Sequence, residues 1–405
     1  MAKKNKGGLP SAFLLDARLE EVLCQLLKID SAEWSATKAL YASGTAWSRC
    51  VIPKKKGVRI INPPSDPLKR VSRALLTQML QGIPVHTAVH GAHPGTSIVT
   101  NARVHAGFAK AFYLLDLKDA FPSVDRARMR ANLGPKLLTR VSEATDIDPQ
   151  ESQRLVDVLL ELLLVEDVMP QGFPTSPAVL NIVLGPVDRE ISRLLREETV
   201  RENVTYRYTR FLDDLTITTD ANEIPKSLRQ SIRKVIRHNG WTIQRTKLRY
   251  YGEAPEGDEE RTTKMPEVTG IIPHPDGRLT IARGRLNRFR GIIHGLLKEA
   301  DARLAADAEA LAKVSVQMEE DVKVFAAAGK TLDPTLSPDQ FYARDWPLTT
   351  EEHDLVAGIV GFVGMVYDGD LPAIIRKPYL EAKTRFRIGM RHLSGGRGYR
   401  VALTV

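Results

Sequence analysis

The chain has 405 residues, 43% of them hydrophobic and 26% charged, and a net charge of +9 at pH 7. This length can bury a large core and suggests two or three lobes, or one elaborated domain. No stretch approaches the roughly 18 uninterrupted apolar residues that span a bilayer, so no membrane association is expected. The two cysteines, Cys24 and Cys50, form no CxxC pair, which argues against a disulfide framework and a zinc site. Residues 1–8 are basic and lack the apolar segment of a signal peptide, so we expect a cytoplasmic protein.

The N-terminal part is predicted to be helical. Leucines at helical spacing predict an amphipathic helix over residues 11–28, and Ser31 marks the start of a second helix. Residues 51–61 are typical of a β-hairpin that turns at Lys56-Gly57, and residues 68–80 are predicted to be helical again.

The central part mixes short strands with helices. A fully apolar strand is predicted over residues 112–117, and two short strands flank Asp213-Asp214 within residues 205–218. The remaining predicted elements are helices over 126–164, a turn-rich loop at 170–177, a helix from Ala178, a helix over 226–238, a strand over 241–251 and helices after Arg285. This mixture predicts an α+β fold.

Three carboxylates stand out from this pattern. Asp116 ends the apolar strand, and Asp213-Asp214 lies between two alternating runs. Adjacent carboxylates repel each other, and a divalent cation such as Mg²⁺, which prefers oxygen ligands, would compensate them. Two such ions are what a phosphoryl-transfer enzyme needs. From these residues alone, a polar turn and an ordinary strand end remain the alternative.

Positive charge is segregated along the chain. One cluster comprises Lys54–Lys56 with Arg59, a second lies at residues 283–290, and a third at residues 376–400. Segregation of this kind suits a nucleic-acid channel better than a uniformly solvated surface, although net charge alone does not require such a partner. An acidic stretch from Glu299 to Asp321 separates the second and third clusters.

Four segments, in order, resemble the palm motifs of reverse transcriptases. They are Leu115–Val124, Pro170–Pro177 in the form PQGxxTSP, Tyr208–Thr216 around the paired aspartates, and Gly240–Lys247. Two further segments resemble signatures of the retron type, namely NAxxH at Asn101–His105 and VTG at Val268–Gly270. The resemblance covers roughly residues 50–290. Any one of these segments alone would be a weak signal, and their order makes a chance match improbable.

The resemblance implies a right-hand polymerase of fingers, palm and thumb, with a small antiparallel palm sheet flanked by helices. We expect an N-terminal helical extension at residues 1–48, fingers at 49–110, and a palm with inserted fingers helices at 111–270. Residues 271–405 would then form the primer grip, the thumb and a C-terminal basic region. The acidic stretch stays unexplained, since an insertion within the thumb and a protein contact are both open.

The resemblance also assigns roles to residues. It implies a catalytic role for Asp116, Asp213, Asp214 and Lys247, with two Mg²⁺ ions, for which Mn²⁺ could substitute, held by the aspartates and the Leu117 carbonyl. The residues expected at the deoxynucleoside triphosphate are Arg59, Asp119, Ala120, Phe121 and Gln171, with Phe121 as the steric gate against a 2′-hydroxyl. Those expected to contact RNA are Asn101, His105, Val268, Thr269, Gly270, Arg283, Arg285 and Arg288.

Two positions depart from the family pattern. Leu212 stands where the family usually has alanine, and Ala120 replaces the first of two aromatic residues. Neither removes an expected metal ligand, so both bear on speed and fidelity rather than on activity.

The implied function is RNA-directed DNA synthesis, in which part of a cognate noncoding RNA is copied into single-stranded DNA that stays attached to it. The resemblance implies a role in anti-phage defence and a separate effector protein as partner. A defence-associated reverse transcriptase outside the retrons and a non-catalytic RNA-binding scaffold are the alternatives. Retention of all three palm aspartates weighs against the scaffold.

Overall fold

The protein is described here by a computed structural model, and the residues it describes are 9–53, 57–253, 258, 260–262, 265–306, 349–368 and 370–385. The predictions for Lys54–Lys56, for residues 307–321 of the acidic stretch and for residues 386–400 of the last basic cluster lie outside these ranges. The chain divides into two compact units. The first contains the chain up to Thr269 together with residues 273–278, and the second contains residues 270–272 and the chain from Leu279.

A four-stranded antiparallel sheet lies at the centre of the first unit, in the strand order β4-β5-β3-β6. Its strands are β3 (Ala111–Asp116), β4 (Tyr206–Phe211), β5 (Asp214–Thr219) and β6 (Arg249–Tyr251). Strand β3 is apolar along most of its length and almost fully buried, as expected for an inner strand covered on both faces. The predicted strand over 112–117 and the predicted pair within 205–218 are therefore confirmed.

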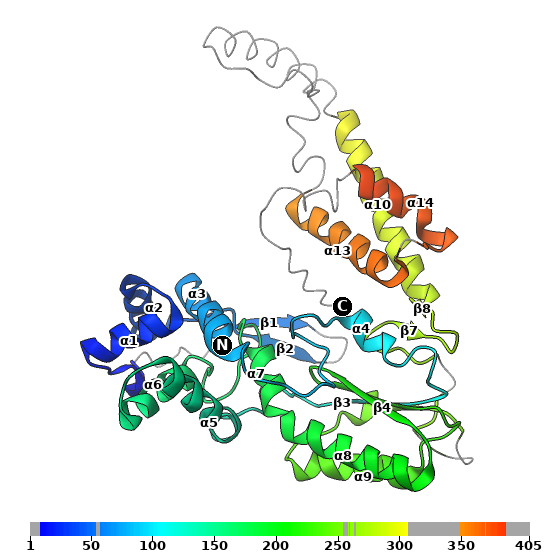
Figure 1. Ribbon diagram of the computed structural model, residues 1–405. Helices are drawn as coiled ribbons and strands as arrows, with labels where there is room; N and C mark the ends of the chain where they lie inside the picture. The colour runs from blue at the N-terminus through cyan, green and yellow to red at the C-terminus, as the bar shows by residue number, and fades with distance from the viewer. Residues whose placement is uncertain are drawn as a thin grey trace. The chain divides into compact units, whose positions relative to one another are not determined.

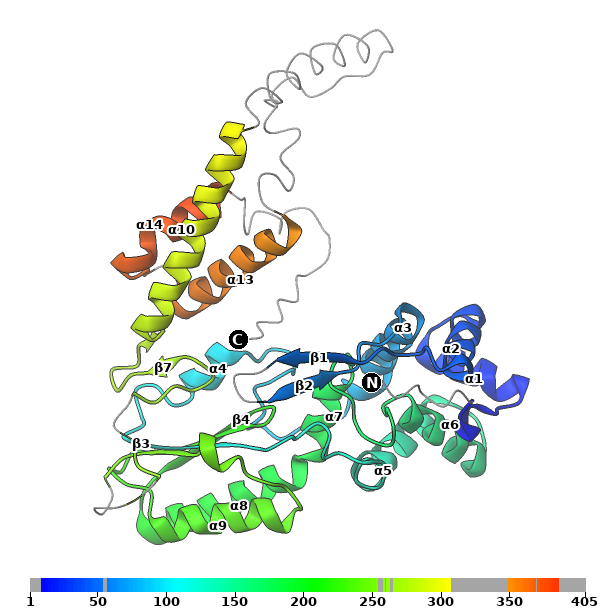
Figure 2. The same ribbon diagram turned by 180° about the vertical axis from the view of Figure 1, so that it is seen from behind.

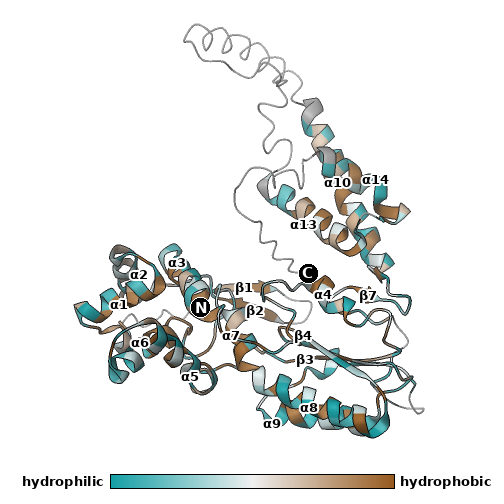
Figure 3. Ribbon diagram, viewed as in Figure 1, coloured by the Kyte–Doolittle hydropathy of each residue, from teal (hydrophilic) through white to brown (hydrophobic). Residues whose placement is uncertain are grey.

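Helices α8 (Gly185–Glu202) and α9 (Lys226–His238) run along one face of this sheet, as Figures 1 and 2 show, while α4 (Ile98–Arg103) lies on the opposite face. In α9 the side chains of Leu228, Ile232 and Ile236 recur every four residues and are buried, so one side of the helix faces the sheet. Figure 3 shows hydrophobic and hydrophilic residues interspersed along both helices, as this one-sided burial requires.

The remaining helices of the first unit build a separate layer on one side of the sheet (Figure 1). They are α1 (Ala17–Leu27), α2 (Ser31–Ser43), α3 (Asp66–Leu75) with a π-type turn at Leu76–Leu80, α5 (Arg126–Ala144), α6 (Pro149–Glu161) and α7 (Ser176–Val183). The sequence predicted these helices, with small errors at their starts. The predicted helix over 11–28 is interrupted after a 3-10 turn at Ser11–Phe13, because the Asp16 side chain caps α1 by accepting from the Leu19 N–H at 2.9 Å. Helix α2 begins at the predicted Ser31, and the Asp30 side chain before it is the cap.

Strands β1 (Cys50–Pro53) and β2 (Val58–Ile61) pair as the predicted antiparallel hairpin. The register sets Ile52 opposite Arg59 and Val51 opposite Ile60, so the two faces of the hairpin carry different side chains. The hairpin continues into a hydrogen bond from the Asn62 N–H to the Gln171 carbonyl at 2.7 Å. The hairpin is thereby tied to the turn-rich loop at 170–177.

The predicted strand over 241–251 is wrong for most of its length. Only β6 is a strand, because a 3-10 turn at Arg245–Lys247 interrupts the extended chain. Before that turn, the buried Trp241 ring stacks under the Arg128 guanidinium at 4.4 Å, and Ile243 forms a single bridge with Leu117. These contacts with residues distant in sequence replace the continuous strand pairing that the alternation of apolar and polar residues predicted.

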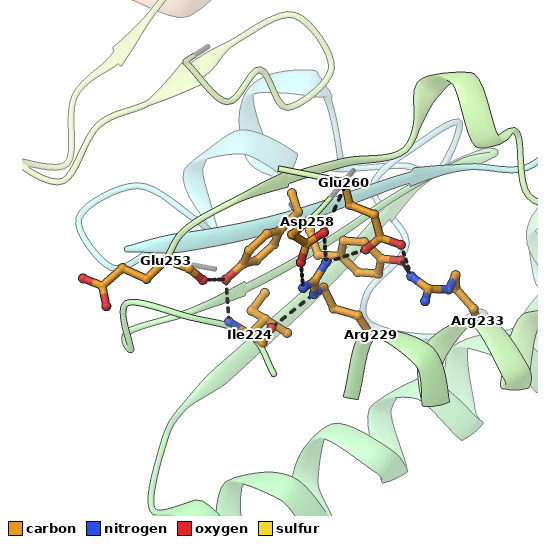
Figure 4. Close-up of polar contacts among 8 residues, drawn as sticks. Ile224, Arg229, Arg233, Glu253, Asp258 and Glu260 are labelled. Atoms are coloured by element: carbon orange, nitrogen blue, oxygen red, sulfur yellow. Dashed lines mark hydrogen bonds and ion pairs between the residues drawn. The ribbon is translucent and has the colours of Figure 1, made fainter. Parts of the chain in front are cut away.

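A buried ion network ties α9 to the chain that follows β6 (Figure 4). The Arg229 guanidinium forms ion pairs with Asp258 and Glu260, and Glu260 also pairs with Arg233. The Arg229 side chain is 2% exposed and that of Asp258 is 4% exposed. Because a buried charge is costly unless it is paired, this network holds Asp258 and Glu260 against α9.

The second unit is helical, as predicted. It contains α10 (Arg283–Ala306), α13 (Thr350–Tyr367) and α14 (Ala373–Arg385), preceded by the short paired strands β7 (Ile272–Pro273) and β8 (Leu279–Thr280). Phe289 of α10 packs edge-to-face on Phe362 of α13, with 5.9 Å between ring centroids, and Arg303 forms a bidentate ion pair with Glu352. Within the described ranges, no helix has both the length and the apolar character needed to cross a bilayer.

Candidate active site

The sheet register brings the three aspartates together. Asp116 at the end of β3 lies directly opposite Asp214 at the start of β5. Asp213 belongs to the turn that joins β4 to β5, and its carbonyl accepts from the Leu117 N–H at 3.0 Å. Residues about 100 positions apart in sequence therefore lie together where two adjacent strands of the sheet meet the β4–β5 turn, as the motif order predicted.

The turn that carries Asp213 has an unusual backbone. Leu212, its first central residue, has φ = 55°, a left-handed conformation that glycine adopts most readily in two-residue hairpin turns. The turn packs against Gly91, where an added Cβ would lie 2.8 Å from the Leu212 nitrogen and 3.1 Å from its Cγ. The absence of a side chain at Gly91 therefore makes room for Leu212, the residue at which this chain departs from the family pattern.

Burial and mutual repulsion change the acidity of the paired aspartates. Burial, followed by the charge of Asp116, raises the pKa of Asp213. Burial of the turn, followed by the charges of Asp213 and Asp116, raises the pKa of Asp214 to about 8, although part of this residue reaches solvent. These carboxylates are thus held closer together than their charges favour.

Lys247 supplies positive charge at this cluster. Its ammonium nitrogen lies 2.5 Å from Asp116 Oδ2, and the 3-10 turn at Arg245–Lys247 brings it there. Partial burial lowers the pKa of Lys247, but the hydrogen bond to Asp116 and the charges of the three aspartates together outweigh burial, so the pKa is raised. Lys247 thus partly compensates the negative charge of Asp116.

The donor set fits a divalent cation. Three carboxylates and the Leu117 carbonyl are hard oxygen donors, and one ammonium does not neutralise three carboxylates. In the described part of the chain, however, no three His, Cys, Asp or Glu side chains converge on a preformed cation site. An incomplete cage of this kind suits Mg²⁺, which keeps water ligands and is commonly bound through one or two carboxylates plus substrate phosphates.

Arg59 on β2 faces this cluster. Its charge lowers the pKa of Asp213, so the guanidinium lies within electrostatic range of the carboxylates. Its Nε atom is buried and has no hydrogen-bond partner. Gln171, also expected at the nucleotide, is half-buried in the loop that Asn62 ties to the hairpin. The structure thus brings the expected nucleotide-binding residues of two separate segments to one region.

The segment after β3 holds the other residues expected at the nucleotide. Asp119 is exposed and left-handed, with φ = 49°, and the Ala120 side chain is buried. Phe121 is half-buried and packs against the edge of the hydrophobic core. Part of the Phe121 ring therefore remains exposed, whereas the side chain of Ala120 is covered.

The two retron signatures meet each other. Asn101 in α4 donates from Nδ2 to the Thr269 hydroxyl at 3.4 Å, and Val268 is 1% exposed beside it. His105 is also 1% exposed, and its two ring nitrogens lie 2.8 Å from the hydroxyls of Thr209 and Thr218 in β4 and β5. The side chains of Asn101, His105 and Val268 are therefore buried, and His105 links the end of the α4 segment to β4 and β5. The predicted RNA contact at these positions stays untested.

The remaining residues expected to contact RNA lie in the second unit. Arg283 and Arg288 are exposed at the start of α10. Arg285 is half-buried, and its Nη1 donates to the Gly270 carbonyl at 3.1 Å. Gly270 has φ = 84°, a backbone conformation that favours glycine, and an added Cβ there would displace the end of the Arg285 side chain.

A known protein family matches the region that contains the four palm motifs. The family model described as "Reverse transcriptase (RNA-dependent DNA polymerase)" matches residues 52–256, slightly more than half of the chain. The chain belongs to the reverse transcriptase family. Its α+β architecture is accordingly that of a right-hand polymerase, as the motif order predicted.

Within this family, the chain is similar to retron reverse transcriptases, which confirms the predicted resemblance to the retron type. It is 28% identical over 305 residues to the retron Mx162 reverse transcriptase of Myxococcus xanthus, covering 70% of this chain and 60% of that protein. It is 30% identical over 256 residues to the retron Mx65 reverse transcriptase of the same organism, covering 62% of this chain and 56% of that protein. The chain thus spans well under two thirds of the length of these relatives.

The sequence analysis did not identify the residues that hold the Leu212 turn in place. Arg210 in β4 and Asp188 in α8 form an ion pair in which both side chains are 0% exposed. One signal was available in the sequence. Arg210 lies two positions before Leu212 in a predicted strand, and alternate residues of a strand face the helices that cover the sheet, so a buried charge was to be expected there. The partner Asp188 could not be recognised, because nothing in its local sequence separates it from a solvated helix residue.

Proposed function

We propose that this chain is an RNA-directed DNA polymerase that copies part of a cognate noncoding RNA into single-stranded DNA, and that it acts in anti-phage defence. The observation that carries the proposal is the sheet register, which sets Asp116 opposite Asp214 with Asp213 beside them. Family membership and similarity to retron reverse transcriptases support the RNA template and the DNA product.

In this proposal, two Mg²⁺ ions at Asp116, Asp213 and Asp214 would activate a 3′-hydroxyl and stabilise the leaving pyrophosphate. The chain's own residues bind and orient the substrates. The buried Arg59 Nε without a hydrogen-bond partner supports a role for this guanidinium at the triphosphate, which Arg binds through several donors at once. The half-buried ring of Phe121 supports a role under the sugar, where it would exclude a 2′-hydroxyl.

Lys247 has a defined place in this scheme. Its raised pKa keeps the ammonium protonated at neutral pH, and it already contacts Asp116. A protonated group beside the cluster can neutralise charge on the triphosphate or give a proton to the leaving pyrophosphate. Asp119, Ala120 and Gln171 would complete the nucleotide site, and the exposed Arg283 and Arg288 would contact the nucleic-acid backbone.

The test starts from the full chain expressed from its native locus. The protein is purified, and the bound nucleic acid is sequenced and treated separately with ribonuclease and deoxyribonuclease. We expect a hybrid of RNA and attached DNA that is absent from an Asp213→Ala, Asp214→Ala double variant. A matched control is Glu166→Ala, Asp167→Ala, since these adjacent acids also belong to a turn with left-handed residues, with φ of 49° and 64°, and Asp167 pairs with Arg126 and not with a residue of the aspartate cluster.

The control variant should retain the hybrid. Bound RNA without attached DNA, together with deoxynucleotide incorporation on a primed RNA, would replace the retron proposal by a defence reverse transcriptase of another kind. Absence of incorporation on any primed RNA with Mg²⁺ or Mn²⁺ would favour the non-catalytic scaffold. Loss of phage resistance in cells that carry the double variant would support the defence role and allow a search for the separate effector protein.

A further inference from the structure

The most deeply buried charge beside the candidate active site is Arg210 of β4. Its Nε and Nη2 donate to the two carboxylate oxygens of Asp188 at 2.8 and 2.7 Å. Tyr208 also donates to Asp188, at 2.7 Å. Both members of the ion pair are 0% exposed. A fully buried ion pair seldom contributes net stability relative to apolar residues of the same volume, so its presence calls for another explanation.

The third nitrogen of the guanidinium, Nη1, reaches the Leu212 turn. Arg210 Nη1 donates to the Leu212 carbonyl at 2.9 Å and to Asn181 Oδ1 at 3.0 Å. Leu212 is the residue with φ = 55° that precedes the paired aspartates. One guanidinium therefore connects the helix carrying Asp188, the helix carrying Asn181 and the turn.

The same turn is held from its other side. Asn181 Nδ2 donates to the Gly91 carbonyl at 2.7 Å, and the Gly91 backbone lies against Leu212. The His90 N–H in turn donates to the Arg210 carbonyl at 2.8 Å. These contacts close a ring around Leu212, and every donor of the ring is a buried or backbone group with a fixed direction.

A second buried arginine in the same unit shows that such pairing need not involve the site. Arg229 is also almost fully buried and pairs with Asp258 and Glu260 (Figure 4), but its remaining hydrogen bond is to the Ile224 carbonyl. None of its hydrogen bonds in the described part of the chain reaches the turn. Arg229 therefore serves as a matched control for the loss of a buried arginine.

We propose that Arg210 is a positioning residue that fixes the Leu212 turn, and thereby presents the Asp213 and Asp214 carboxylates together to a divalent cation. The proposal rests on the proposed function of this site. Arg210 does not touch substrate, and it acts through the Leu212 carbonyl. The planar fork is required because lysine, a compact point charge, cannot serve Asp188, Asn181 and Leu212 at once.

The test measures Mn²⁺ binding by the full chain, followed by the electron paramagnetic resonance signal of the free ion. The part of the binding that Asp213→Ala, Asp214→Ala removes is assigned to the site. We expect Arg210→Lys to weaken this part on the order of tenfold, as outer groups that orient metal ligands commonly do. Arg229→Lys should leave it unchanged, even where both variants lower the melting temperature alike.

A second variant covers the case in which Arg210→Lys does not fold. Gly91→Ala removes no charge and places a Cβ 2.8 Å from the Leu212 nitrogen, so it displaces the same turn from the opposite side. We expect it to weaken site-specific Mn²⁺ binding as well. Equal Mn²⁺ affinity in the wild type and both turn variants would overturn the proposal. So would a loss of Mn²⁺ affinity in Arg229→Lys as large as that in Arg210→Lys. A wild-type chain whose Mn²⁺ binding does not depend on Asp213 and Asp214 would overturn it as well. A wild type that binds Mn²⁺ in the expected pattern but makes no DNA would overturn the proposed function alone.

Discussion

His105 illustrates how a signature residue acts through its burial. Both ring nitrogens face threonine hydroxyls, so the neutral ring is satisfied with one nitrogen donating and the other accepting. Burial, with smaller contributions from His90 and Arg207, lowers the pKa of His105 to about 3. The ring is therefore neutral in the folded protein throughout the physiological range, and it is better described as a structural link than as a surface for RNA.

This lowered pKa predicts a dependence of stability on pH. In the unfolded chain His105 titrates near 6.5, whereas in the folded protein it stays neutral down to about 3. The stability it contributes is fully present above pH 6.5 and is lost as the pH falls toward 3, because only the unfolded state gains the proton. Between pH 6.5 and 5 the free energy of unfolding should fall by about 1.5 kcal/mol through this residue. Urea unfolding of wild type and His105→Gln at both pH values measures the difference, and parallel pH dependences would contradict it.

Phe121 carries the prediction about sugar selection. Its ring is half-buried at the edge of the hydrophobic core. If it is the steric gate that the family resemblance implies, a smaller side chain opens space for a 2′-hydroxyl. We expect Phe121→Val to raise the ratio of ribonucleotide to deoxynucleotide incorporation by roughly ten- to a hundred-fold, the range for removing one steric barrier in a pocket. The ratio is insensitive to a general loss of folded protein. Phe112→Val, a buried aromatic on β3 that packs against Tyr251, is the control and should leave the ratio unchanged.

At the scale of elements, the sequence predicted what local patterns determine. Helix α9 begins and ends at the predicted residues, and the strands around Asp213-Asp214 lie where the alternation placed them. The strand predicted over 241–251 failed because the Arg128 stack on Trp241 and the turn at Lys247 depend on residues distant in sequence. Arg210–Asp188 could not be predicted for the same reason, since the pairing exists only once α8 covers the sheet.

The ion network of α9 supports a prediction about how one element holds another. Replacing Arg229 by Met removes the partner of Asp258 and Glu260 and leaves a carboxylate buried without compensation (Figure 4). The free energy of unfolding should fall by about 3 to 5 kcal/mol. Arg193→Met is the control, because Arg193 pairs with Glu197 on α8 with both side chains more than half exposed, and it should cost less than about 1 kcal/mol. Similar losses in the two variants, measured by chemical denaturation, would show that the network does not hold the chain after β6.

At the scale of the whole molecule, the two units differ in what they contribute. The first contains the aspartate cluster and a sheet covered on both faces. The second is a helical unit whose longest described helix starts with exposed arginines. A net charge of +9 does not by itself indicate a nucleic-acid partner. Exposed charge on one helix is more informative, because it is available to a polyanion.

The salt dependence of nucleic-acid binding tests this reading of the charge. If Arg283 and Arg288 each contact a phosphate, replacing either by Ala should make the slope of log K against log salt concentration less negative by about 1. The change should be the same for primer–templates of unrelated sequence, because backbone contacts carry no sequence information. Arg193→Ala removes the same charge from α8 and should leave the slope unaltered, since Glu197 already pairs with it. Binding titrations at several salt concentrations measure the slopes. A sequence-dependent loss, or an equal change in Arg193→Ala, would mean that these arginines act through base recognition or net charge and not through contacts of α10 with the backbone.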